Sequence, residues 1–212
     1  MTYFMGIDIS TTSAKALIID EKGAVIALGS TPQPSSQPYP LWSEQNPTDW
    51  WMGVVDAIGQ ALASAHLTGK DIRAIGLTGQ MHGLVMMDTA GRVLRPAILW
   101  NDQRTQAQCE TITEKIGAER LIELTGNRAL TGFTAPKILW VREHEPEIYA
   151  QCAHILLPKD YIRYCLSGDY AMDMADGSGT LLMNVADRTW SGDVVGALDI
   201  PYAWLPRLYE GS

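Results

Sequence analysis

The chain has 212 residues, a length that falls between that of an average single domain and that of two domains. Hydrophobic residues make up 46% and charged residues 19% of it, which excludes an intrinsically disordered chain and leaves enough apolar side chains for a buried core. The formal net charge of −8 argues against a general nucleic-acid-binding protein, because such proteins need a basic surface. An acidic chain can still hold a phosphate group through backbone N–H groups and one or two lysines.

Three cysteines, Cys109, Cys152 and Cys165, follow no metal-ligand spacing. Their odd number argues against a disulfide framework, and a reducing compartment fits them better. The N-terminus lacks a basic segment before its short apolar stretch, and no apolar run reaches the ~18 residues of a membrane span. We therefore expect a soluble cytoplasmic protein with no membrane partner and no nucleic-acid partner.

The first thirty residues predict three strands, at residues 3–9, 14–20 and 24–30. The connections between them are too short for a parallel return, so the three strands are expected to pair antiparallel. Residues 31–47, rich in Pro, Ser and Gln, predict an irregular connection. A helix with one apolar face is then expected to start near Pro47 and to end at Gly69.

The rest of the chain changes from short strands to helices. A buried strand is predicted at residues 73–78, and Asp88-Thr89-Ala90-Gly91 indicates a hairpin turn. Further elements are predicted as strands at 97–100 and 154–157 and as helices at 103–116, 118–124, 135–143, 145–150 and 158–166. This order predicts an α/β domain with a mixed sheet, and the early hairpin disfavours a purely parallel Rossmann sheet. Neither G-x-G-x-x-G after the first strand nor G-x-x-x-x-G-K-[ST] occurs.

Asp8 ends the first predicted strand and is followed by Ser10-Thr11-Thr12-Ser13 and then Lys15. Small hydroxyl residues in a tight turn let backbone N–H groups face an anion, and a carboxylate at that place can hold hydrated Mg²⁺. The alternative is a strand end capped by Ser and Thr, and spacing alone favours this structural interpretation.

The run Gly79-Gln80-Met81-His82-Gly83 follows the predicted strand at 73–78. Its glycines would permit close approach of a ligand, His82 could hydrogen-bond a sugar hydroxyl, and Met81 could line an apolar patch. The alternative is a structural histidine in a Gly-rich turn, and the motif alone is weak evidence.

Trp100-Asn101-Asp102-Gln103-Arg104 offers an aromatic face and several donors and acceptors, a combination suited to polyol recognition. The alternative is that Asn101 or Asp102 caps the helix that follows. Further along, Trp140 is expected in the core, and the acids of 173–180 predict a polar loop, because their spacing is not that of an EF-hand.

The order of these motifs is more specific than any one of them. The whole series resembles the amino-terminal domain of the FGGY carbohydrate kinases, and within that family the xylulokinase branch. The residues that carry the resemblance are Gly6-Ile7-Asp8-Ile9-Ser10-Thr11-Thr12-Ser13-Ala14-Lys15, Trp42-Ser43-Glu44-Gln45-Asn46-Pro47, Gln80-Met81-His82-Gly83, Leu99-Trp100-Asn101-Asp102-Gln103-Arg104, Gly132-Phe133-Thr134-Ala135-Pro136-Lys137, Leu157-Pro158-Lys159-Asp160-Tyr161 and Asp176-Gly177-Ser178-Gly179-Thr180.

The resemblance implies an actin-like, ribonuclease-H-like α/β domain over residues 1–212, with a mixed five-stranded sheet flanked by helices. It implies ATP-dependent phosphorylation of a sugar, D-xylulose above all, with Mg²⁺, in a cleft shared with a carboxy-terminal ATP-binding domain absent from these residues. The residue roles that it implies are phosphoryl and Mg²⁺ orientation by Asp8, phosphate contact by Thr11, Thr12 and Lys15, ketose contact by Met81 and His82, and shaping of the sugar pocket by Trp100 and Asp102.

Two departures from the family pattern bear on these implications. Ser10 and Ser13 stand where the family usually has glycine, and a serine tolerates unusual φ angles less well. No acid in the chain matches the family's general-base aspartate, which belongs beyond Ser212. The alternatives are a truncated, non-catalytic sugar-binding or regulatory domain, or a kinase for ribulose, gluconate or glycerol. A homodimer would also fit the family.

Overall fold

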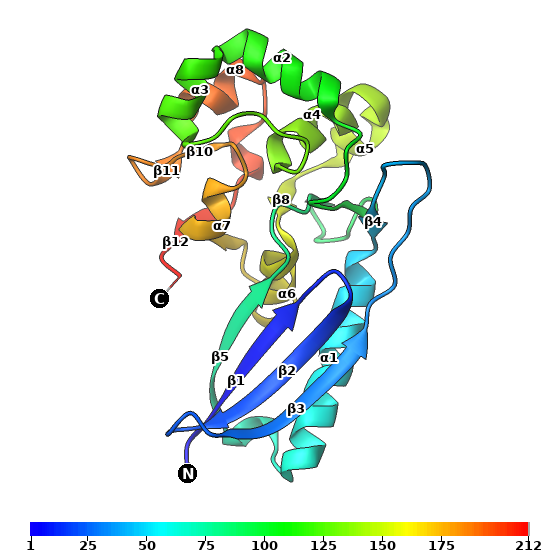
Figure 1. The fold of residues 1–212 in the computed structure, drawn as a ribbon, viewed down its shortest axis with the longest axis vertical. Coiled ribbons are helices and arrows are strands. Elements are labelled where there is room, and N and C mark those ends of the chain that lie inside the picture. The colour runs from blue at the N-terminus through cyan, green and yellow to red at the C-terminus, as the bar shows by residue number, and fades with distance from the viewer. Residues whose placement is uncertain (212) are drawn as a thin grey trace. The chain divides into compact units, whose positions relative to one another are not determined.

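Figure 1 shows the computed structural model, which describes residues 1–211. The chain divides into two units: unit 1 contains residues 1–35 and 46–80, and unit 2 contains residues 36–45 and 81–211. The two units are distinguished only by how compactly their residues pack, which does not define a functional domain. One functional domain over residues 1–212 therefore stays a prediction. No helix in the described part of the chain is long and apolar enough to cross a membrane.

Unit 1 is a mixed four-stranded sheet with one helix packed along one face (Figure 1). The strand order is β3-β2-β1-β5; β1 pairs antiparallel with β2 and parallel with β5, and β2 pairs antiparallel with β3. The bounds of its elements are β1 Tyr3–Ile9, β2 Ser13–Asp20, β3 Val25–Pro32, α1 Pro47–Ala65, the 3₁₀ turn Gly69–Asp71 and β5 Ile72–Gly79. The predicted antiparallel meander and the mixed sheet are confirmed.

Alternation along the strands decides which face of the sheet is buried. Met5, Ile7 and Ile9 of β1 are buried, and so are the alternate residues of β2. They share one face with the apolar side of α1, whose backbone approaches β3 so closely that a β-carbon on Gly29 would lie 2.0 Å from the carbonyl oxygen of Ala57. The side chains of the remaining residues of each strand therefore point to the opposite face of the sheet.

Helix α1 begins as predicted and ends earlier than predicted. Asn46 caps its start by accepting a hydrogen bond from Thr48 N at 3.1 Å, with Pro47 in the first turn. At its end, His66 adopts φ 54° and the backbone N–H of Leu67 bonds back to Leu62 O at 3.0 Å. This pattern is a Schellman motif with histidine in the place where glycine is usual. The end predicted at Gly69 is therefore wrong.

The fifth strand of the predicted sheet is not found, since the largest sheet in residues 1–211 has four strands. After β5 the chain leaves unit 1 at Gln80, and the strands of unit 2 pair in twos. Those pairs are β4 with β7, β6 with β8 and β10 with β11, all antiparallel, and β9 with β12, which are parallel.

Unit 2 is built mainly from helices around one apolar core, with α4 buried along most of its length. Trp140 of α4 belongs to this core, as predicted. The three cysteines are free in the described part of the chain. The bounds of the elements of unit 2 are β4 Glu44–Gln45, β6 Val85–Met87, β7 Ala97–Ile98, α2 Gln106–Ile116, α3 Ala118–Thr125, α4 Thr134–His144, α5 Pro146–Gln151, β8 His154–Leu156, α6 Pro158–Ser167, β9 Ala171–Asp173, α7 Met174–Ser178, β10 Met183–Asn184, β11 Thr189–Trp190, α8 Gly192–Ala197, the 3₁₀ turn Tyr202–Trp204 and β12 Arg207–Tyr209.

Candidate functional site

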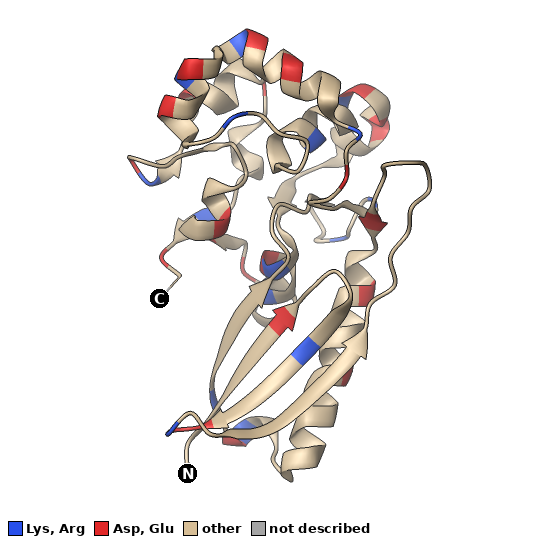
Figure 2. Ribbon diagram, in the orientation of Figure 1, with Lys and Arg blue, Asp and Glu red and all other residues tan. Residues whose placement is uncertain are grey.

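The predicted phosphate-side residues, Asp8, Thr11, Thr12 and Lys15, lie together at one end of the β1–β2 hairpin in unit 1. Asp8 and Lys15 are direct partners in the register of the two strands, so both side chains stand on the same face of the sheet. That face is the one opposite α1. The interior of these strands is otherwise without charge, as the ribbon coloured by charge shows (Figure 2).

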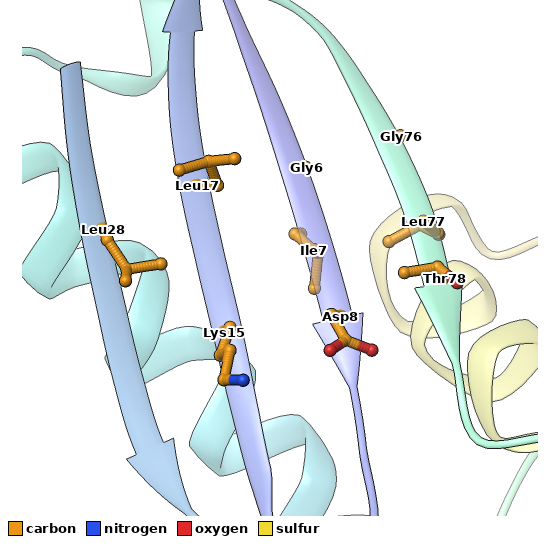
Figure 3. Close-up of a pocket in the computed structure, with 9 residues that line it drawn as sticks. All are labelled: Gly6, Ile7, Asp8, Lys15, Leu17, Leu28, Gly76, Leu77 and Thr78. Carbon is orange, nitrogen blue, oxygen red and sulfur yellow. The ribbon is translucent and has the colours of Figure 1, made fainter. Parts of the chain in front are cut away.

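A hollow of about 430 Å³ lies over this face, and Figure 3 shows Asp8 and Lys15 side by side at one end of it. Thr78 of β5 pairs with Asp8 on the other side, so a hydroxyl, a carboxylate and an ammonium follow one another across three strands. Apolar side chains and bare backbone form the rest of the lining, which consists of Gly6, Ile7, Leu17, Leu28, Gly76 and Leu77.

The turn between β1 and β2 closes on itself through its serines. Ser10 Oγ donates to Ser13 O at 2.9 Å, and Ser13 N donates back to Ser10 Oγ at 3.1 Å. None of the turn residues has a positive φ. The serines that replace the family's glycines therefore impose no backbone strain. Thr11 Oγ1 donates to Gln80 Oε1 at 3.3 Å, which ties the turn to the residue that follows β5.

The Asp8 carboxylate suits a hydrated magnesium ion. Within residues 1–211 no hydrogen bond or ion pair occupies its oxygens, and it lines the open hollow. A single carboxylate with several waters is a common way in which proteins hold Mg²⁺ beside a phosphate. The residues present therefore fit the ion that the resemblance implies.

The predicted sugar-side residues lie in unit 2, and they differ in how accessible they are. Met81 is 51% exposed and Trp100 is 44% exposed, while His82 is half-buried. Burial first, and the nearby Lys137 charge second, lower the pKa of His82 to about 4, against a smaller opposite effect of the Gly179 backbone. The imidazole is therefore neutral at pH 7, the state in which it can both donate and accept a hydrogen bond.

Asp102 is fully buried and its carboxylate is already engaged. It accepts hydrogen bonds from Ser43 N at 2.6 Å and from Arg104 Nη2 at 2.7 Å. The Arg104 guanidinium also bonds Glu44, and it lies within cation–π distance of the rings of both Trp42 and Trp140. Asp102 can thus shape a pocket only through these partners. The alternative that Asn101 or Asp102 caps the next helix is wrong, because α2 begins at Gln106 with Thr105 before it.

The acids of the last motif surround a lysine instead of lining a loop. Asp160, Asp173 and Asp176 offer oxygens within 4.8 Å of one another, as a metal site would. Lys159 Nζ, however, lies 2.7 Å, 2.5 Å and 3.2 Å from these three carboxylates and occupies the position that a metal ion would take. Residues 174–178 form the short helix α7, capped by Asp173, so the predicted polar loop is wrong here.

Two residues that the sequence reasoning passed over lie next to His82. Lys137 is completely buried on α4, and its Nζ donates to His82 O at 2.8 Å. Gly179 lies so close to the imidazole that a β-carbon would be 2.2 Å from Cε1. Both residues belong to the motifs of the family resemblance, but nothing in the sequence indicates their contacts with His82, because both contacts join segments far apart along the chain.

Comparisons with known proteins show which proteins this chain is similar to. The chain is 44% identical over 209 residues to a xylulose kinase of Escherichia coli (strain K12) and 42% identical over 210 residues to one of Bacillus subtilis (strain 168). Each alignment covers 99% of this chain and 42% of the relative, so the chain spans less than half the length of these proteins.

A crystal structure described as a xyloylose kinase from Brucella ovis superposes with a TM-score of 0.92 at 37% identity. The superposition covers 98% of this chain and 43% of that one. Residues 3–212 match the model of the N-terminal domain of the FGGY family of carbohydrate kinases. The fold, the order of the motifs and these similarities agree, and the chain therefore belongs to the FGGY family of carbohydrate kinases.

Proposed function

We propose that the complete natural protein phosphorylates D-xylulose with ATP, giving D-xylulose 5-phosphate and ADP. Membership of the FGGY family and the similarity to xylulose kinases support this substrate and this reaction. Residues 1–212 would supply the sugar-binding half and would be inactive alone, because the family's general-base aspartate has no counterpart among them. A second domain that binds ATP is part of the proposal.

The observation that carries the proposal is the cross-strand pair of Asp8 and Lys15 beside the hydroxyl-rich turn. Phosphoryl transfer is accelerated mainly by positioning and by charge stabilisation, so it needs a cation and a metal-holding carboxylate near the transferred group. Lys15 would offset the charge of the phosphates, and Thr11 and Thr12 would contact their oxygens. Mg²⁺ held by Asp8 would neutralise the charge that develops on the phosphates.

The reaction itself is one in-line displacement. A sugar hydroxyl oxygen forms the new bond to the γ-phosphorus, the bond from that phosphorus to the bridging oxygen breaks, and ADP leaves with the electron pair. The hydroxyl proton passes to a carboxylate base that lies outside this chain. The role of Met81 and His82 would be to hold the ketose, with the indole of Trp100 against its carbon skeleton and Asp102 supporting the pocket from behind.

The test is ADP release by the complete natural protein with D-xylulose, ribulose, gluconate and glycerol as acceptors. The highest kcat/KM is expected for D-xylulose. A clear preference for another acceptor would correct the substrate, and ADP release that depends on none of them would remove the kinase assignment.

A non-catalytic sugar-binding or regulatory domain is the second candidate, because no acid among residues 1–212 matches the family's general-base aspartate. Calorimetry on residues 1–212 with D-xylulose, combined with the assay above, separates the two candidates. Binding without product formation by the complete natural protein would support the second candidate.

A further inference from the structure

His82 sits at the centre of a strained three-residue turn. The turn is closed by a hydrogen bond from Gly83 N to Met81 O at 2.8 Å, and His82 itself adopts φ 61°. An i to i+2 hydrogen bond around a residue of positive φ has the pattern of a γ-turn, which is rare because it is unfavourable for a residue with a β-carbon. Such a conformation persists only where neighbouring groups hold it in place.

Lys137 is the principal group that holds this turn. Its ammonium nitrogen donates to His82 O at 2.8 Å and to Gly132 O at 2.7 Å, and Thr134 Oγ1 donates a second bond to His82 O at 3.2 Å. Lys137 is completely buried, and no carboxylate lies within ion-pair distance of it in the described part of the chain. Burying a lysine without an ion-paired carboxylate is costly, and the hydrogen bonds to the two carbonyls offset part of that cost.

The second carbonyl that Lys137 holds belongs to the segment under Trp100. Gly132 lies so close to the Trp100 backbone that a β-carbon would be 2.8 Å from Trp100 O. The next residue, Phe133, places its ring edge-on to the His82 imidazole with centroids 4.8 Å apart. The Lys137 side chain therefore joins the backbone of the His82 turn to that of Gly132, and Gly132 in turn packs against the Trp100 backbone.

We propose that Lys137 is a positioning residue for the sugar: by holding the carbonyl of His82, it fixes the strained turn in the one conformation that presents His82 and Met81 to the ketose. This inference rests on the proposed sugar-binding role of His82. Lys137 itself is completely buried, so its role would be exerted through the turn and not through contact with the sugar.

The test compares steady-state kinetics of four variants in the complete natural protein with D-xylulose and ATP. Lys137→Met keeps the length of the side chain but removes its hydrogen bonds. We expect it to raise the KM for D-xylulose by about tenfold or more, with kcat and the KM for ATP changed less than about threefold. A purely structural role would lower the melting temperature without this selective rise in the sugar KM.

Thr134→Val removes only the weaker bond to His82 O and keeps the proposal testable if Lys137→Met does not fold. It should raise the KM for D-xylulose by roughly threefold. The matched control is Thr113→Val, which removes a similar hydroxyl bond, to Cys109 O at 2.8 Å, on α2. This control should leave the sugar KM at the wild-type value.

His82→Ala separates failure of this inference from failure of the proposed function. If His82→Ala leaves the KM for D-xylulose unchanged, the sugar-binding role of His82 is wrong and the proposal has lost its basis. If His82→Ala raises the KM but Thr134→Val and any folded Lys137→Met do not, the positioning role alone is overturned.

Discussion

A β-carbon on Gly179 would lie 2.2 Å from Cε1 and 2.4 Å from Nδ1 of the His82 ring. No real side-chain atom tolerates such a distance, so the imidazole rests directly on bare backbone at this point. Gly179 follows α7, whose first residues are held by the Lys159 cluster defined by Asp160, Asp173 and Asp176. The motif Asp176-Gly177-Ser178-Gly179-Thr180 thus supports the His82 side chain.

Gly179→Ala should displace the His82 ring, because the methyl group claims space that the ring now occupies. We expect the affinity for D-xylulose to fall by about tenfold or more, as measured by calorimetry. Gly196→Ala is the control, since a β-carbon there, in α8, would meet no atom within 4 Å. Equal sugar affinity in the two variants would show that sugar binding does not depend on the position of the His82 ring.

His82→Ala should weaken pentulose binding by roughly 1–3 kcal/mol, the usual cost of leaving a buried polar partner unpaired. Isothermal calorimetry measures this change directly. His144→Ala, an exposed histidine of the same unit, should leave the affinity as it is. Matching affinities in the two variants would rule out a hydrogen bond between His82 and the sugar.

Asp8→Asn should cut turnover by at least about a hundredfold while leaving the affinity for D-xylulose nearly unchanged, because the carboxylate would act on the phosphate side. The assay is ADP release at saturating sugar and ATP, with sugar affinity measured separately by calorimetry. Asp49→Asn, which changes an exposed acid in the first turn of α1, is the control and should keep full turnover. Loss of sugar binding in Asp8→Asn would instead place Asp8 in the sugar pocket.

Lys137 should make the stability of the protein rise with pH above neutrality. Burial lowers the pKa of Lys137 to about 7, with Asp102 opposing this shift and Arg104 adding to it. Between pH ~7 and ~10.5 the unfolded chain binds a proton that the folded chain does not, so stability increases by up to about 1.4 kcal/mol per pH unit. Below pH ~7 both states are charged and the full cost of burying the ammonium remains.

The measurement is urea unfolding of the wild type and of Lys137→Met at pH 7 and pH 9. Because the two proteins differ only at residue 137, the difference between them reports the contribution of Lys137. The difference in unfolding free energy should shift in favour of the wild type at the higher pH. A difference that is independent of pH would mean that the lysine keeps its ordinary pKa in the folded state.

Local patterns predicted much of the fold. The alternation in residues 3–9 and the proline at the start of α1 were enough to predict β1 and the first turn of the helix. The end of α1 escaped prediction because His66 takes a conformation that usually marks glycine. The missing helix cap at Asp102 has a partly long-range cause, since its carboxylate accepts from Ser43 N, 59 positions away, as well as from the neighbouring Arg104.

The candidate site was predicted only where its residues are neighbours in the sequence. Asp8 and Lys15 are joined by a short hairpin, so their shared face follows from the register of that hairpin. The partners of His82 could not be predicted in this way. Lys137 is 55 positions away, and its helix reads as ordinary core. Only the folded backbone brings its ammonium under the His82 turn.

The self-bonded turn from Ser10 to Ser13 has a consequence for how the charged pair is built. Because side chains alternate between faces, one residue added to or removed from this turn would shift the register and send Asp8 and Lys15 to opposite sides of the sheet. Exchanging its serines for other small residues would remove their hydrogen bonds but impose no backbone strain, since no residue in the turn needs a left-handed backbone. The length of the loop, more than its chemistry, decides which side of the sheet carries the carboxylate beside the ammonium.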